Sequence, residues 1–128
     1  MIILDHNIPE DQAQQLRRQR IHFRQIGFEV GRPEWDDLQE ILRFLHATKQ
    51  ITFFTRDLGF FRGRLCHSNY CLVVLTVPVL ETADYIRKVL RHPDFKTRAK
   101  RNSKVMKVST DRITFWKTGR QRQSTTRW

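Results

Sequence analysis

Two aspartates that follow apolar runs are the residues of this chain best placed for chemistry. Asp5 comes directly after the run 1–4, and Asp57 comes shortly after the run 51–54. Both runs predict buried strands, and open α/β sheets bind ligands at the carboxyl ends of such strands. Carboxylates gathered there can hold Mg²⁺ or Mn²⁺, since both ions prefer hard oxygen ligands. Such an ion can activate a water and stabilise a departing oxygen, which is chemistry suited to a phosphodiester.

Further oxygen donors lie near these two aspartates or at the start of a predicted helix. Asn7 can orient Asp5 or bind a metal through its carbonyl oxygen. Asp36, Asp37 and Glu40 lie at or near the start of that helix, and Asp37 and Glu40 share a face because they are three residues apart. One of these three acids is expected to reach over the strand ends. A strand-end Asp, a helix-start Asp and a second strand-end Asp together point to a metal site more strongly than any one of them.

Each of these residues also has an ordinary structural alternative. Asp5 can cap the turn that follows it, and Asn7 can form an Asx-turn before Pro9. Asp57 can cap the turn that contains Gly59. Acids in a first helical turn commonly interact with the helix dipole alone. These alternatives stay open from the residues themselves.

The charge of the chain is strongly positive and unevenly distributed. The chain has 24 Lys and Arg against 13 Asp and Glu, a net charge of +11. Residues 1–64 carry ten basic and nine acidic side chains, whereas residues 65–128 carry fourteen and four. This asymmetry favours a polyanionic partner, most simply nucleic acid, and the alternative is a solubilising surface with a basic tail. The residues expected to contact RNA phosphates are Arg56, Arg62, Lys100, Arg101 and Lys104.

Composition also indicates a cytoplasmic protein with no membrane partner. Every apolar run is far shorter than the ~20 residues of a membrane span. The first residues lack the basic leader and the length of a signal peptide. Cys66 and Cys71 are expected to be free thiols, because disulfides are rare in a reducing compartment.

Apolar periodicity predicts an α/β fold in which strands alternate with helices. The clearest helix is predicted from the stripe Leu38, Ile41, Leu42 and Leu45. Strands are expected over 1–5, 28–30, 50–55 and 70–77, with further helices from Pro9 towards Gly27 and over 82–90. Residues 91–104 are expected to be a basic surface loop, and 104–109 with 112–116 a hairpin. The predicted domain is 1–117, followed by a basic flexible tail over 118–128.

The order and spacing of these segments resemble the small PIN-like family related to VapC-type toxins, over roughly residues 1–116. Asp5-x-Asn7-Ile8-Pro9 is similar to the family's Asp-Glu-Asn-Leu-Pro opening, and Thr55-Arg56-Asp57 to its Thr-x-Asp motif. The resemblance implies an α/β PIN-like three-layer fold, with a mainly parallel central sheet flanked by helices and a C-terminal β-hairpin. It also implies a metal-dependent endoribonuclease, the toxin of a toxin–antitoxin pair. Asp5, Asp37 and Asp57 would then be the catalytic, metal-binding residues, with Mg²⁺ or Mn²⁺ as cofactor.

Two positions depart from the family pattern. His6 stands where the family often has Glu, and Gly59 where it usually has a further Asp. His6 is a candidate base or a group that supports the metal ligands. The missing acids motivate an alternative, a catalytically weakened module that binds RNA or a protein partner without cleavage. A third reading is a subunit whose basic surface docks an antitoxin or forms a homodimer.

Overall fold

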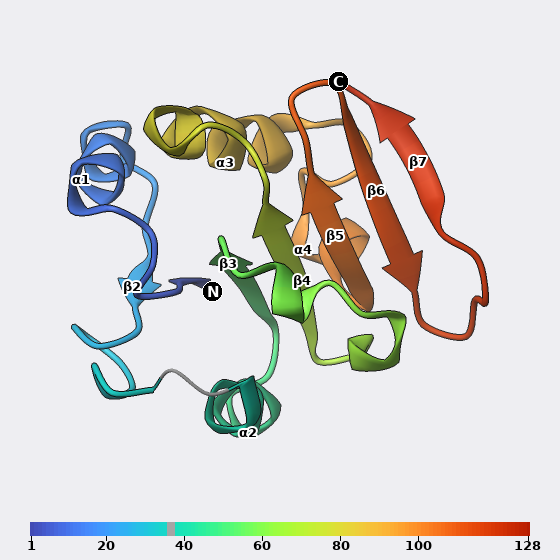
Figure 1. Ribbon diagram of the computed structural model, residues 1–128, viewed down its shortest axis with the longest axis horizontal. Helices are drawn as coiled ribbons and strands as arrows, with labels where there is room; N and C mark the ends of the chain where they lie inside the picture. Colours follow the sequence, from blue (N-terminus) through green and yellow to red (C-terminus); the bar gives the residue numbers. More distant parts are fainter. Residues whose placement is uncertain (36–37) are drawn as a thin grey trace.

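A single mixed sheet organises the protein, which is described here by a computed structural model covering residues 1–35 and 38–128 (Figure 1). Across the described residues, the strand order is β2-β1-β3-β4-β5-β6-β7. The strands are β1 (Ile2–Leu4), β2 (Arg24–Gln25), β3 (Ile51–Thr55), β4 (Tyr70–Leu75), β5 (Lys104–Val108), β6 (Arg112–Lys117) and β7 (Ser124–Arg127). The α-helices are α1 (Glu10–Arg18), α2 (Leu38–Ala47), α3 (Thr82–Arg91) and α4 (Arg98–Arg101). Short 3-10 helices are η1 (Leu58–Phe60), η2 (Gly63–Leu65) and η3 (Val79–Glu81).

The sheet combines parallel and antiparallel pairing. Strands β2, β1, β3, β4 and β5 run parallel to one another, while β6 and β7 continue the sheet in antiparallel pairing. The predicted hairpin is therefore confirmed as β5 and β6. The expectation of a mainly parallel sheet is wrong, because β7 adds a second antiparallel pairing beyond that hairpin.

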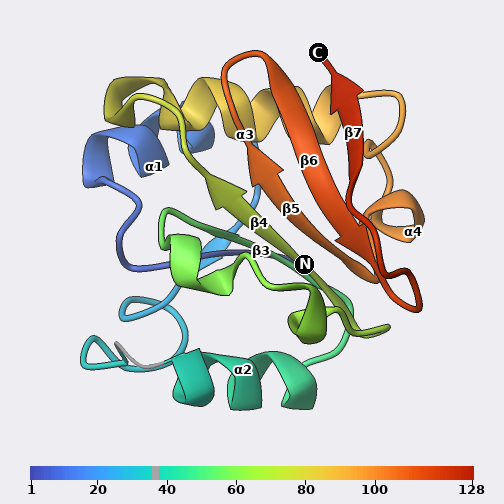
Figure 2. The same ribbon diagram turned by 45° about the vertical axis from the view of Figure 1, so that its right-hand side comes forward.

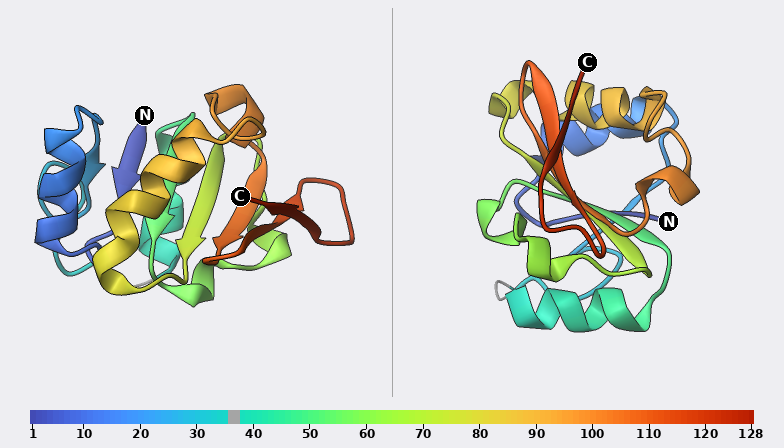
Figure 3. Two further views of the ribbon diagram at one scale, coloured as in Figure 1. Left: turned by 90° about the horizontal axis from the view of Figure 1, so that it is seen from above. Right: turned by 90° about the vertical axis from the view of Figure 1, so that its right-hand side faces the viewer.

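Helices cover both faces of the sheet, which gives three layers (Figure 2, Figure 3). On one face, α1 and α3 bury residues such as Leu16 and Ile86 against strand residues that include Phe54 and Val73. On the other face, the predicted apolar stripe of α2 packs over strand residues that include Phe53. All positions of β3 and β4 are buried, as expected for strands covered on both sides.

The segment after α1 differs from the sequence prediction. The helix ends at Arg18, and Arg20 adopts a left-handed backbone conformation (φ 61°) that a helix cannot continue through. The chain then turns into the short strand β2, so the strand lies at residues 24–25 rather than 28–30. Gly27 (φ 88°) forms the turn that follows, where a Cβ atom would lie 3.1 Å from the Cα of Pro33.

The C-terminal part is more ordered than its composition predicts. The basic segment 91–104 contains α4, and residues 124–127 of the predicted flexible tail form β7. β7 pairs with β6 in register, with Ser124 opposite Phe115 and Thr126 opposite Ile113. Within the residues that the structure describes, no helix has the length and apolarity needed to cross a membrane.

Candidate active site at the carboxyl ends of β1 and β3

The two strand-end aspartates belong to neighbouring parallel strands. β1 pairs with β3, and the Asp5 backbone N–H donates to the Phe54 carbonyl at 2.9 Å. Asp5 therefore lies beside the end of β3, where the chain continues to Asp57. The Asp5 side chain is only 1% exposed, whereas Asp57 is exposed. The structure thus brings the segments that carry these two predicted residues together at one edge of the sheet.

The Thr55 hydroxyl is the centre of this site. It donates to Asp5 Oδ2 at 2.6 Å and accepts from the Asn7 side-chain amide at 3.2 Å and from the Asp57 backbone N–H at 3.0 Å. A threonine hydroxyl has one proton and two lone pairs, so its capacity is fully used. Thr55 is completely buried. The sequence prediction used this residue only as part of a motif and missed its role as the link between the candidate ligands.

The structure shows which contacts Asn7 and Asp57 make, and so bears on the turn and capping roles that the sequence left open for them. The Asn7 side chain contacts the end of β3 and the residue after it, because its amide donates to the Thr55 hydroxyl and its Oδ1 accepts from the Arg56 N–H at 3.1 Å. Asn7 therefore joins two segments and does not act only within its own turn. Asp57 does take the capping role, since its Oδ1 accepts from the Gly59 N–H at 2.8 Å at the start of η1.

The buried Asp5 carboxylate is held by a dense set of donors. Oδ1 accepts from the His6 backbone N–H at 2.8 Å and lies 2.8 Å from the His6 imidazole Nδ1, while Oδ2 accepts from Thr55. Burying a carboxylate is costly unless it is paired or hydrogen-bonded, and these contacts offset that cost. His6 therefore contacts Asp5 directly, through its backbone N–H and its ring.

Gln25 fixes the loop that carries Asp5. Its buried side-chain amide donates to the Asp5 carbonyl and to the Ile8 carbonyl, both at 3.1 Å. These bonds tie β2 to the turn after β1 and hold the backbone of residues 5–8. Gln25 gave no signal in the sequence, because its partners are backbone groups distant along the chain.

The side-chain oxygens at this edge differ in how many hydrogen bonds they already accept. A carboxylate offers about four lone-pair sites, and the contacts of Asp5 with the His6 N–H, the His6 ring and the Thr55 hydroxyl occupy three of them. Asp57 is exposed and uses Oδ1 for its cap, and Asn7 Oδ1 accepts one backbone bond. The side chains of Asp5, Asp57 and Asn7 carry oxygen atoms of the type that Mg²⁺ or Mn²⁺ binds in proteins. In the described part of the chain, no three His, Cys, Asp or Glu side chains form a group able to hold a metal.

Of the other predicted acids, Glu40 lies away from this arrangement. Glu40 lies in the first turn of α2 and lines a separate pocket of about 430 Å³ with Trp35 and Arg43. Asp36 and Asp37 lie outside the described residues.

The two predicted basic residues near Asp57 differ in burial and in hydrogen bonding. Arg56 is half-buried and donates to the Thr82 hydroxyl at 3.1 Å and to the Val77 carbonyl at 2.9 Å. It therefore fastens the end of β3 to the start of α3. Arg62 is exposed at the start of η2 and is positioned at the surface.

The predicted RNA contact at Arg101 is wrong. Its side chain is buried on the sheet, where Nε donates to the Thr52 hydroxyl at 2.9 Å and a terminal nitrogen donates to the Phe95 carbonyl at 3.0 Å. This burial lowers the pKa of the Arg101 guanidinium. Lys100 is exposed, and its ammonium donates to the Pro93 carbonyl at 2.7 Å. Lys104 is half-buried, and its ammonium donates to the Lys100 carbonyl.

The cysteines lie away from the acids and are free thiols, as predicted. Burial raises the pKa of the Cys71 thiol to about 12, with smaller opposing effects from Arg101 and Lys104. Cys66 is less deeply buried, and its thiol pKa is raised for the same reason.

Comparison of the chain with known protein families, curated proteins and solved structures gave no match.

Proposed function

We propose that this protein is a metal-dependent endoribonuclease of PIN-like type. One observation carries the proposal: a single buried hydroxyl, that of Thr55, links Asp5, Asn7 and Asp57 at the carboxyl ends of two parallel strands. Oxygen donors gathered at such an edge suit Mg²⁺ or Mn²⁺. The net charge of +11 favours a polyanionic substrate.

Within this proposal, the residues of the chain hold and orient the reacting groups. When bound, the cation supplies an activated water and stabilises the oxygen that leaves the phosphodiester. Asp5, fixed by His6 and Thr55, provides the rigid ligand, and exposed Asp57 provides the accessible one. The resemblance to the family adds Asp37 as the third acid. It also extends the proposal to a cytoplasmic toxin that an antitoxin protein covers.

A second candidate function is RNA or protein binding without cleavage. Asp57 uses Oδ1 to cap η1, Asp5 is already bonded through both of its oxygens, and position 59 carries no acid. A site with so few free carboxylate oxygens binds a divalent cation weakly. This observation favours a module that keeps the fold and the basic surface but has lost turnover.

Cleavage of a mixed RNA pool by the purified chain distinguishes the two candidates. The reaction is run with Mn²⁺, with Mg²⁺ and with EDTA, for the wild type, for Asp57→Asn and for Asp111→Asn. Asp111 is an exposed acid in the β5–β6 turn, so it controls for the loss of one charge.

We expect cleavage that requires metal, disappears in Asp57→Asn and persists in Asp111→Asn. Cleavage in EDTA, or equal cleavage by both variants, would refute the nuclease proposal as stated. RNA binding without any cleavage by the wild type would instead support the second candidate.

A further inference from the structure

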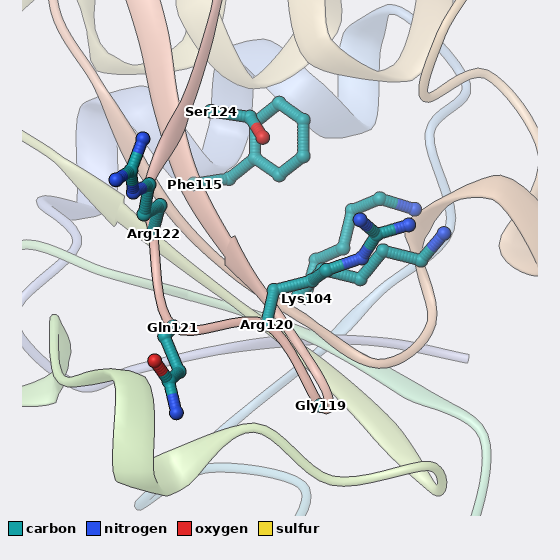
Figure 4. Close-up of a pocket in the computed structure, with 8 residues that line it drawn as sticks. Lys104, Phe115, Gly119, Arg120, Gln121, Arg122 and Ser124 are labelled. Atoms are coloured by element: carbon teal, nitrogen blue, oxygen red, sulfur yellow. The ribbon is translucent and has the colours of Figure 1, made fainter.

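A second polar site lies at the opposite edge of the sheet from the two aspartates. A pocket of about 670 Å³ opens between the start of β5, the end of β6 and the β6–β7 loop (Figure 4). Four of its eight lining residues are Lys or Arg, and none of the eight is acidic. Since β5 runs parallel to β1 and β3 through β4, its first residue marks the amino edge of the sheet. The pocket is therefore separate from the candidate active site.

Two lysines in this pocket face each other across a strand pair. Lys104 and Lys117 are register partners in the antiparallel pairing of β5 with β6. Directly opposed side chains have Cβ atoms about 4.5–5.5 Å apart, and like charges at that spacing destabilise the pair. Burial is the main cause of a lowered pKa of Lys104, and the Lys117 ammonium adds to it against opposing effects from Cys71 and Asp94. A bound anion would relieve this repulsion, so the pair favours an anionic ligand.

The loop between β6 and β7 adds further cations. Arg120 and Arg122 line the pocket and are exposed. Within the described part of the chain, neither guanidinium forms a hydrogen bond or an ion pair. In Figure 4 the Arg120 and Lys104 side chains extend in the same direction, whereas Arg122 points elsewhere from the loop. Arginine forks match phosphate oxygens in geometry and are available here without breaking an existing contact.

One wall of the pocket is aromatic. Phe115 is half-buried, packs edge-on against Phe95 with ring centroids 5.4 Å apart, and lines the pocket beside its strand partner Ser124. Figure 4 shows the Phe115 ring next to the Ser124 side chain. A cationic groove with an aromatic wall is the arrangement that binds single-stranded nucleic acids, since phosphates contact the cations while bases stack on the ring.

We propose that the pocket formed by Lys104, Lys117, Arg120 and Phe115 binds the phosphodiester backbone of single-stranded RNA. The pocket lies at the amino edge of the sheet, whereas Asp5 and Asp57 lie at the carboxyl edge. The pocket can therefore hold RNA whether or not the protein cleaves it. An acidic protein would satisfy the lysines and arginines, but it offers no bases for the aromatic wall.

The test measures RNA binding in EDTA, where a metal-dependent nuclease is silent. The probe is a fluorescent 15-nucleotide uridine RNA, followed by anisotropy across a salt series. The variant is Lys117→Gln/Arg120→Gln, which changes two exposed residues. The control is Arg18→Gln/Arg20→Gln, which removes the same charge at the end of α1, across the sheet from the β6–β7 loop (Figure 1).

Loss of two phosphate contacts should reduce the slope of log K against log salt by about 1.4 and weaken binding about 25-fold at 0.1 M salt. The control should weaken binding by less than about threefold, because charges far from the pocket act on the RNA only through electrostatic interactions that salt screens. Equal losses in the two double variants would overturn the proposal, as would an unchanged salt slope in the Lys117→Gln/Arg120→Gln variant.

A competition arm separates RNA from an acidic protein surface. Poly-glutamate, added at charge equivalence to unlabelled RNA, should displace the probe far less effectively than that RNA. Equal displacement would overturn the assignment of the pocket to nucleic acid. A negative result in the binding experiment would not refute the cleavage proposal. A negative result in the cleavage experiment would not refute RNA binding by the pocket, so the two proposals can be refuted separately.

Discussion

Replacing Thr55 with valine is the sharpest test of how the candidate site is held together. Valine replaces the threonine hydroxyl with a methyl group of similar size, so at this fully buried position the main change is the loss of the hydroxyl. It removes the hydroxyl that donates to Asp5 Oδ2 and accepts from the Asn7 amide and the Asp57 N–H. All three groups then lose the same partner at once.

The expected loss in the free energy of unfolding depends on how exposed each of the three groups is to water once its partner is removed. Asp5 is 1% exposed, so its carboxylate oxygen loses a charge-assisted bond that water cannot easily replace, at about 1.5–3 kcal/mol. The Asn7 amide and the Asp57 N–H are nearer the surface, where water replaces most of what is lost. We therefore expect Thr55→Val to lower the free energy of unfolding by about 3 kcal/mol, roughly 150-fold in the folding equilibrium.

Urea denaturation followed by circular dichroism measures this change, with the m-value as a check that the unfolded state is unaltered. Thr55→Ser is the matched control, because it keeps the hydroxyl and removes one methyl group, at a cost of about 1 kcal/mol. A Thr55→Val protein within 1 kcal/mol of the wild type would refute the reasoning. Equal losses in the two variants would do so as well, because packing alone would then explain them.

Three further predictions concern single residues. In Gly59→Asp, Mn²⁺ affinity measured by calorimetry should rise about tenfold, because the Cβ atom would lie 3.1 Å from Asp57 Oδ1 and bring a second carboxylate to the site. Arg101→Met should lower the free energy of unfolding by about 2 kcal/mol and leave RNA affinity unchanged, since the guanidinium is buried on two acceptors. The free energy of unfolding should fall as pH rises above about 9, because the unfolded Cys71 thiol ionises near 8.5 while its folded pKa is about 12. Cys71→Ala should remove that part of the pH dependence, up to about 1.4 kcal/mol per pH unit.

Each of these has an outcome that would contradict it. Gly59→Asn, of the same size but uncharged, should not raise Mn²⁺ affinity, and an equal rise would remove the electrostatic explanation. Arg98→Met changes an exposed residue of α4 and should leave stability nearly unchanged. A similar loss there would mean that the buried contacts of Arg101 are not the cause. Superimposable alkaline stability curves for Cys71→Ala and the wild type would contradict the pH argument.

The features that the sequence predicted are those with a strong apolar pattern. β4 is a continuous apolar run, β3 combines apolar residues with threonine, both are buried at every position, and α2 follows its predicted stripe. The meeting of Asp5 with the end of β3 followed from parallel strands sharing one carboxyl edge. These inferences hold because burial on both faces of a sheet leaves a direct trace in residue type.

The features that the sequence missed depend on partners distant along the chain. Arg101 sits in a basic segment typical of a surface loop, yet its acceptors belong to β3 and to Phe95. β7 is polar throughout and is held by backbone pairing with β6, which leaves no trace in side-chain type. Thr55 was identified only as part of a motif, because nothing local shows that one hydroxyl serves three partners.

The order of the strands also bears on how the protein avoids aggregation. A seven-stranded sheet has two outer strands whose backbone groups can pair with another molecule. Here the outer strands are β2, with two residues, and β7, with four polar or charged residues, and each carries an arginine. The apolar strands β3 and β4 lie in the middle, each paired on both sides. The strands with the most apolar residues therefore have no unpaired edge. A second molecule could pair only with β2 or β7, which are short and carry charge.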